Sequence, residues 1–393
     1  MLDHTLDYRL DAGLIVSSWQ ETVREQPHRS PSAIAAQMGI TEEDLLLARV
    51  MEQEDPESPL FEEQRSVAPL RLDWTSLLRH VHGLGRIRTV TRNLWAVLER
   101  QGIAPNCRDG IRETLLAGDE IQLRVNSSGW RSGFAVVGPG RTHGGASYSF
   151  QFFGHDGHAS LKIFLEDEAY ARVFKDLVEA YSAYGGPSSF ARWVHQLDAV
   201  RTLSKDEEAP SVPREQLDRE QFLAAWGLLQ HPQDLATLCA RYGLRRVDAL
   251  RMAEGVHCEV VSPGALRVLL NHLAPSGTPV QVTVANAGCA QTYTGPVTKV
   301  MDWRGWMDAV GSEMELHIRE EALAAAWLVR TPHRDHVMGK DDVSESLEFA
   351  EAGGAMVVRV EAPPVEDVVG RRFWRKAIDE LTPGAKIRET RAS

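Results

Sequence analysis

Cysteine is scarce in this chain, and long apolar runs are missing altogether. The 393 residues include four cysteines, Cys107, Cys239, Cys258 and Cys289, and none of them forms a C-x-x-C pair. This spacing argues against a disulfide framework and against a structural zinc site. No stretch of about 18 apolar residues is present, so we expect no membrane insertion. The first nine residues lack the basic start and apolar run of a signal peptide. We therefore expect a cytoplasmic protein with reduced thiols.

Excess positive charge and the common catalytic motifs are also missing. The formal net charge is −12, which argues against nucleic acid or anionic lipid as a general partner, because both require a basic surface. The chain has no G-x-S-x-G, G-K-S/T or H-E-x-x-H motif, and Gly83-Leu-Gly85 lacks the third glycine of a dinucleotide loop. A small anionic ligand stays compatible with this composition, provided that a few arginines or lysines converge locally.

The composition and length are those of a globular protein with more than one domain. Hydrophobic residues make up 43% and charged residues 25% of the chain, and the length suggests two domains at about 150 residues each. Residues 13–50 are predicted to form a helical pair, with Gly39 ending one helix and Thr41 capping the next. A helix-turn-helix for DNA binding is an alternative, but no helix rich in arginine and lysine follows.

The middle of the chain alternates between strands and helices. An acidic, proline-containing connector covers residues 51–68, and a helix is expected at 74–83. Alternating apolar residues predict strands from Ile87 to about Leu165. Further helices are expected at about 167–183 and 189–202. A charged segment with two prolines, residues 203–216, is predicted to be a linker.

The pattern repeats after this linker. Trp74 followed by Leu77–His80 is echoed by Trp226 followed by Leu228–His231, and Ser149–Phe153 is echoed by Ser346–Phe349. A tryptophan-centred helix follows each, at Trp193 and Trp374. We therefore predict an α+β fold with an internal duplication, in which two antiparallel β-sheet repeats are each flanked by helices. The expected domains are residues 1–202 and 217–393, joined by the linker 203–216.

Residues 284–300 form the most informative segment. They are predicted to make two short strands around the Gly288-Cys289 break, with a Thr294-Gly295 turn and Lys299 beyond it. This ribbon resembles that of the cytoplasmic haem-handling proteins of the HemS/ChuS/PhuS family. Other segments similar to the family lie in order along both repeats: Met38–Thr41, Thr91–Asn93, Leu123–Arg124, Ser149–Phe153, Leu244–Arg246, Leu316–His317, Trp327–Arg330, Ser346–Phe349 and Trp374–Arg375.

The resemblance implies a ligand and a function. It implies a large antiparallel sheet in each half and a haem cleft in residues 217–393, with Arg124 contributing from the first half. The implied function is cytoplasmic haem trafficking, oxidative haem degradation, or both. Ring opening would require O₂ and an external reductant. A haem transporter, a haem oxygenase or a reductase would be the partner proteins.

The expected axial histidine is replaced in this chain. Matching the family from Trp226 without gaps places Gln233 at the axial position, and the nearest histidine is His231, before Pro232. Within a continuous helix, two residues turn a side chain by about 200°. Pro232 suits a first helical turn, so His231 would lie at or before the cap and could point elsewhere. His231 is either the iron ligand or a partly exposed cap histidine.

The cations expected near the haem carboxylates are retained. The resemblance matches Arg246 and Lys299 to cations of the second repeat and Arg124 to an arginine that approaches from the first. Arginine and lysine suit carboxylates, although each of these residues could instead form a surface ion pair. His317 lies in the middle of a predicted strand and is either a satisfied core histidine or a group near the cleft.

Some features favour other interpretations. The last strand offers Arg359 alone where the family has a tyrosine and an arginine. His155/His158 and His333/His336 have H-x-x-H spacing in predicted turns, where a metal site or a solvated loop is possible. The alternative function is a non-enzymatic paralogue that kept the fold but binds another anionic tetrapyrrole or a protein partner.

Overall fold

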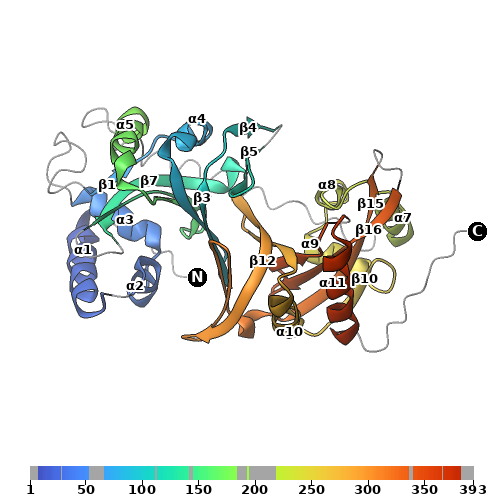
Figure 1. Cartoon of the computed structure of the whole chain (residues 1–393). Helices are drawn as coiled ribbons and strands as arrows, with labels where there is room; N and C mark the ends of the chain where they lie inside the picture. The colour runs from blue at the N-terminus through green and yellow to red at the C-terminus, as the bar shows by residue number, and fades with distance from the viewer. Residues whose placement is uncertain are drawn as a thin grey trace, which may run out of the picture. The chain divides into compact units, whose positions relative to one another are not determined.

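The chain divides into two compact units. The computed structural model describes residues 8–27, 29–52, 66–110, 113–140, 145–183, 193, 218–335, 340–364 and 366–381. Unit 1 comprises residues 1–92, 100–208 and 286–290, and unit 2 comprises residues 93–99, 209–285 and 291–393. Figure 1 labels the α-helices and several of the strands of both units. The predicted linker 203–216 and most of the predicted helix 189–202 lie outside the described residues, so the domain boundaries drawn from the sequence stay a prediction.

Unit 1 places helices before and after an antiparallel sheet. Five of its strands are joined in the order β1-β7-β8-β9-β2, and β4, β5 and β6 form a smaller ladder. Its elements are α1 (Tyr8–Glu25), α2 (Pro31–Gln37), α3 (Glu42–Met51), β1 (Val67–Pro69), α4 (Trp74–His80), β2 (Arg86–Arg92), β3 (Ala96–Ile103), β4 (Cys107–Asp109), β5 (Thr114–Ala117), β6 (Gln122–Val125), β7 (Trp130–Pro139), β8 (Ala146–Gly154), β9 (Ala159–Leu165) and α5 (Ala171–Tyr181). Residues 96–99 of β3 belong to unit 2.

Unit 2 repeats this plan. Five strands are joined in the order β10-β15-β16-β17-β11, and β12, β13 and β14 form an antiparallel meander. Its elements are α7 (Arg219–Gly227), α8 (Asp234–Arg241), α9 (Arg246–Met252), β10 (Cys258–Val261), α10 (Ala265–Leu273), β11 (Pro279–Ala285), β12 (Cys289–Trp303), β13 (Trp306–Gly311), β14 (Met314–Ile318), β15 (Ala325–Asp335), β16 (Lys340–Ala350), β17 (Met356–Glu361) and α11 (Val368–Leu381).

The predicted α+β duplication is confirmed, but one of the sequence echoes is wrong. Both units run through three helices, a short strand, one further helix and then the sheet, so α7 corresponds to α1 and α10 corresponds to α4. Trp226 lies in α7, whereas Trp74 lies in α4, so these two tryptophans occupy different positions of the repeat. The echo of Ser149–Phe153 in Ser346–Phe349 is correct, because β8 and β16 are equivalent strands.

The helices before each sheet follow from their capping residues. The predicted pair at 13–50 consists of three helices, and Thr41 caps α3 as expected: its hydroxyl accepts from the Asp44 N–H while Asp44 accepts from the Thr41 N–H. Gly39, before α3, and Gly243, before α9, both have positive φ, at 73° and 62°. The same left-handed turn thus connects α2 to α3 and α8 to α9.

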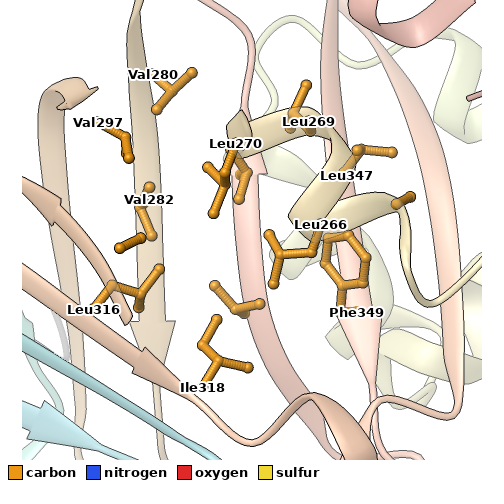
Figure 2. Packing of buried hydrophobic residues seen from close by; sticks show 14 of the residues in the cluster. Leu266, Leu269, Leu270, Val280, Val282, Val297, Leu316, Ile318, Leu347 and Phe349 are labelled. Atoms are coloured by element: carbon orange, nitrogen blue, oxygen red, sulfur yellow. The ribbon is translucent and has the colours of Figure 1, made fainter. Parts of the chain in front are cut away.

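Packing of apolar side chains from α10 against the sheet forms the core of unit 2. Leu266, Leu269 and Leu270 recur at helical spacing on α10 and are fully buried. Figure 2 shows them against Val282 of β11, Leu347 and Phe349 of β16. Burial of each such side chain contributes about 1.5–3 kcal/mol. The core also contains Ala96 and Leu98, which come from the first half of the sequence.

Each unit thus contains a short segment from the other half of the chain, and each such segment begins at an asparagine. The Asn286 amide donates to the carbonyls of Arg92 (2.8 Å) and Ser160 (2.9 Å), and its oxygen accepts the N–H groups of Gly288 and Cys289, both at 2.9 Å. The predicted ribbon break around Gly288 is therefore confirmed as an asparagine-centred turn between β11 and β12. The predicted turn at Thr294-Gly295 is wrong, because β12 is one strand from Cys289 to Trp303.

Asn93 makes the same set of bonds in unit 2. Its amide donates to the carbonyls of Ala285 (3.2 Å) and Val357 (2.8 Å), and its oxygen accepts the N–H groups of Trp95 and Ala96. Ala285 ends β11 as Arg92 ends β2, and Val357 and Ser160 lie in the equivalent strands β17 and β9. The two asparagines are therefore equivalent positions of the duplication.

The segment 286–290 fits into unit 1 because two glycines allow close backbone approach. A Cβ on Gly288 would lie 2.3 Å from Cδ1 of Trp130, and a Cβ on Gly129 would lie 2.4 Å from the Ala287 carbonyl oxygen. The Asn126 N–H donates to the Gly288 carbonyl at 3.0 Å. The glycine of the Gly-Cys break is thus required by packing.

Replacing Asn286 with alanine is expected to destabilise the protein by about 2–4 kcal/mol, because several partly buried backbone groups lose their partners together. Urea unfolding followed by tryptophan fluorescence measures this loss. Asn271→Ala is the matched control, since Asn271 is an exposed residue of α10 and should change the unfolding free energy by less than about 0.5 kcal/mol. Equal stability of the two variants would contradict the role assigned to Asn286.

Candidate functional site

His231 lies in the short connection between α7 and α8, at an exposed position. Its backbone N–H donates to Oδ2 of Asp234 at 2.9 Å, and its ring Nδ1 accepts the Gln233 N–H at 3.2 Å. Desolvation, followed by the neighbouring His333, lowers the pKa of the His231 ring below its usual value. Gln233 is the exposed N-cap residue of α8. The expectation that His231 precedes the helix is confirmed, and its ring takes part in capping it.

The second histidine at this position is His333, which sequence analysis placed in a turn. That placement is wrong, because β15 continues to Asp335 and pairs with β16 up to Asp335 opposite Lys340. The centres of the His231 and His333 rings are 5.1 Å apart, with an angle of 69° between the ring planes. The side chain of His336 lies outside the described residues. The apolar run Ala325–Val329 could have signalled a strand, but its extension past Pro332 to His333 is fixed by pairing with β16.

Arg246 opens α9 and is held by a buried carboxylate. Its Nε lies 2.9 Å from Oε2 of Glu348 and its Nη2 lies 2.5 Å from Oε1, and the Glu348 side chain is 1% exposed. Burial alone would raise the pKa of Glu348, but the charge and hydrogen bonds of Arg246 and the charge of Arg359 outweigh it, so the pKa is lowered. Both members of the pair are therefore charged at neutral pH.

Arg359 and Glu361 of β17 connect this ion pair to His231. Arg359 lies opposite Glu348 in the strand register, and its Nη2 is 3.1 Å from the Glu361 carboxylate. Glu361 in turn acts electrostatically on both Arg246 and His231. The Nε of Arg359 is buried and has no hydrogen-bond acceptor within the described parts of the chain. We use the name unit 2 polar cluster for the following residues: His231, Arg246, His333, Glu348, Arg359 and Glu361.

The equivalent position in unit 1 carries the opposite charges. Glu42 opens α3 as Arg246 opens α9, and Lys162 of β9 lies 2.5 Å from its carboxylate. Lys162 faces Gln151 in the strand register, as Arg359 faces Glu348. The first turn of α3 thus presents carboxylates where α9 presents a guanidinium. Each helix start therefore has one cation and one carboxylate in an ion pair, with the two charges exchanged between helix and sheet.

The other residues suggested by the sequence lie elsewhere. Lys299 is exposed on β12, opposite Val310. His317 of β14 is half-buried, and its Nδ1 is 2.8 Å from the carboxylate of Asp308 across the strand pair. Arg124 belongs to unit 1, where its Nε is 3.3 Å from the Glu113 carboxylate. The charge of Glu361 acts on both His231 and Arg246. In the described residues, the structure records no contact of Lys299 or His317 with this cluster.

The alternative histidine motif of unit 1 lies in a turn, as predicted. His155 and His158 lie in the turn between β8 and β9, and Nε2 of His155 is bonded to the Ser128 carbonyl at 3.0 Å. Over the described ranges, no group of three or more histidine, cysteine, aspartate or glutamate side chains could hold a metal ion. Those ranges also contain no helix that is both long and apolar enough to cross a bilayer.

The chemistry available at the unit 2 polar cluster is that of nitrogen donors beside paired charges. Two imidazoles from separate elements can donate to a metal, and a neutral His231 is the form that binds one. The buried Nε–H of Arg359, which has no acceptor among the described residues, is available to donate to a carboxylate oxygen.

Comparison with known proteins supports a single family. Hemin transport protein HemS of Yersinia enterocolitica is 24% identical over 368 residues, which cover 93% of this chain and 97% of HemS. The crystal structure of holo-PhuS, a heme-binding protein from Pseudomonas aeruginosa, matches with 26% identity and a TM-score of 0.76, covering 94% of this chain and 99% of PhuS. ChuS, an Escherichia coli heme oxygenase, matches with 25% identity and a TM-score of 0.70, covering 94% of this chain and 99% of ChuS.

A family model covers most of both repeats. The description of that model is "Haemin-degrading HemS.ChuX domain", and it matches residues 59–181 and 243–381. These two ranges together are more than half of the chain and fall on the two copies of the duplicated fold. The protein therefore belongs to the haemin-degrading HemS.ChuX domain family.

Proposed function

We propose that this protein binds haem in the cytoplasm, for trafficking or for oxidative degradation during iron acquisition. The observation that carries the proposal is the unit 2 polar cluster, where an imidazole donor and cations come together in a member of the HemS.ChuX family. Relatives similar over more than nine tenths of the chain are described as a hemin transport protein, a heme-binding protein and a heme oxygenase.

His231 is the residue proposed to ligate the haem iron. Its ring is exposed and its lowered pKa keeps it neutral at pH 7, which is the form that binds iron. Since its Nδ1 accepts the Gln233 N–H, the neutral ring carries its proton on Nε2. Ligation through Nε2 requires the other tautomer and the loss of this bond, which costs about 0.5–1.5 kcal/mol.

Arg359 is better suited than Arg246 to bind a haem carboxylate. Arg246 already makes two charged hydrogen bonds to Glu348, so a propionate would have to compete with a buried carboxylate. The Nε of Arg359 is a buried donor without an acceptor among the described residues, and a carboxylate oxygen would satisfy it. In this proposal Arg246 positions Glu348 and, through it, Arg359. Lys299 of the same unit contributes charge from outside the cluster.

The protein would supply position and electrostatics, while other proteins would deliver haem or electrons. Oxidative ring opening consumes O₂ and electrons, so it requires an external reductant. A haem transporter, a haem oxygenase or a reductase is the proposed partner class.

Hemin titration of the apo-protein should give a one-to-one complex with a sharp Soret band. His231→Ala should weaken hemin binding at least tenfold, because the imidazole donor is lost. Gln233→Ala is the control, since Gln233 takes the axial position when the family is matched from Trp226 without gaps. This variant should bind hemin as the wild type does. If Gln233→Ala loses the Soret band and His231→Ala keeps it, the assignment of the ligand is reversed.

A free-hemin spectrum of the wild type would disprove haem binding. Loss of the Soret band on adding ascorbate would distinguish haem degradation from haem transfer.

Arg246→Ala should destabilise unit 2 by about 3–5 kcal/mol, because it leaves the Glu348 carboxylate buried without its partner. Chemical denaturation of the apo-protein measures this. The double variant Arg246→Met/Glu348→Leu should recover most of the loss, since it removes both charges together. If the double variant is as unstable as the single one, the loss comes from packing and not from the unpaired charge.

The Glu348 carboxylate should also make stability depend on acid pH. Because its pKa is lower in the folded protein than the unfolded value of about 4.3, its contribution is complete above pH 4.3 and disappears as the pH falls through the folded value. Glu348→Gln should therefore flatten the loss of unfolding free energy below about pH 4.3. Gln151 is the neutral residue at the equivalent place in unit 1, so the amide should be accommodated. An unchanged acid profile would contradict this assignment.

A further inference from the structure

The ring pair of His231 and His333 has a geometry that the proposed haem site does not use. The two imidazoles come from different elements, the approach to α8 and the strand β15, and their centres lie 5.1 Å apart. Within the described residues, the His333 ring contacts the His231 ring. His333 is half-buried, so solvent reaches the pair.

The separation of the two rings decides between two kinds of metal ligation. Each ring centre would lie about 3.2 Å from the ion, because the metal–nitrogen bond is about 2.0 Å and the ring centre lies about 1.2 Å beyond the nitrogen. Two imidazoles at a tetrahedral angle then have ring centres about 5.2 Å apart. Two imidazoles on opposite faces of haem iron would have centres about 6.4 Å apart by the same arithmetic. The observed 5.1 Å agrees with the first arrangement and is too short for the second.

We propose that His231 and His333 together bind one first-row divalent transition-metal ion, on adjacent positions of its coordination shell. Imidazole nitrogens suit Zn²⁺, Cu²⁺, Ni²⁺ and Fe²⁺. Asp234 and Glu361 place negative charge near His231, which favours a cation there. Among the described residues, no third histidine, cysteine, aspartate or glutamate side chain joins the pair as a ligand.

This inference shares His231 with the proposed haem site but does not require haem. If the proposed degradation takes place, the iron ion released by ring opening meets this pair next to the place where it is set free. The two uses of His231 exclude each other, because one ring nitrogen cannot ligate haem iron and a second ion together. His333 is specific to the ion, and it therefore separates the two proposals.

Isothermal titration of tag-free apo-protein with Zn²⁺ tests the site, with the nitrogen hyperfine pattern of bound Cu²⁺ in electron paramagnetic resonance as a second measurement. We expect one saturable ion per chain, with two nitrogen donors at the copper. His231→Ala and His333→Ala should each weaken Zn²⁺ binding at least tenfold and remove one nitrogen donor. His82→Ala is the control, because His82 is an exposed histidine outside the cluster and should bind Zn²⁺ as the wild type does.

Several results would overturn the inference. It fails if the wild type shows no saturable Zn²⁺ binding, or if both single variants keep it. A circular dichroism melt of each variant identifies any that has not folded, and His333→Gln then replaces His333→Ala. Hemin titration of the same samples keeps the two proposals apart: hemin binding without Zn²⁺ binding defeats the ion site alone, and Zn²⁺ binding without hemin binding defeats the haem function alone.

Discussion

The asparagine turns at Asn93 and Asn286 are the constraint on which the arrangement of both units depends. Each turn holds its own segment through the side-chain oxygen and ties that segment to two strands through the side-chain amide. Without these bonds, residues 93–99 would not complete the core of unit 2, and residues 286–290 would not pack against Trp130 in unit 1. Neither sheet is therefore built from one half of the sequence alone.

On this common scaffold, the residues that open one helix distinguish the two units. Backbone, turn glycine and strand register are alike at α3 and α9, yet Glu42 pairs with Lys162 in one and Arg246 pairs with Glu348 in the other. A buried ion pair contributes little net stability, while loss of one partner is costly, so such pairs can be retained for the orientation they impose. In unit 2, the buried Nε of Arg359 has no acceptor among the described residues, and its Nη2 lies 3.1 Å from the Glu361 carboxylate.

The sequence predicted the fold better than the site, for local reasons. Strand alternation, the Thr41 cap and the break before Cys289 depend on near neighbours, and all three were correct. The approach of His231 to His333 depends on the register of β15 with β16 and on the placement of α8, which no short-range pattern encodes. The echo between Trp74 and Trp226 failed because similar letters occur in non-equivalent helices, and only the order of elements reveals the true repeat.

Matching the family from Trp226 without gaps placed Gln233, and not His231, at the axial position. Gln233 occupies the N-cap of α8, and the chain just before a helix is not bound to the helical period of about 100° per residue. The side chain of His231, two residues before Gln233, can therefore point in the direction expected for the side chain at position 233. His333 bears on both proposals for His231: at 5.1 Å the rings leave no room for a porphyrin between them, so in the haem proposal the porphyrin approaches His231 from the side away from His333. If both proposals hold, the ion-binding and haem-binding states alternate at one imidazole, and the tetrapyrrole has to leave before the ion is retained.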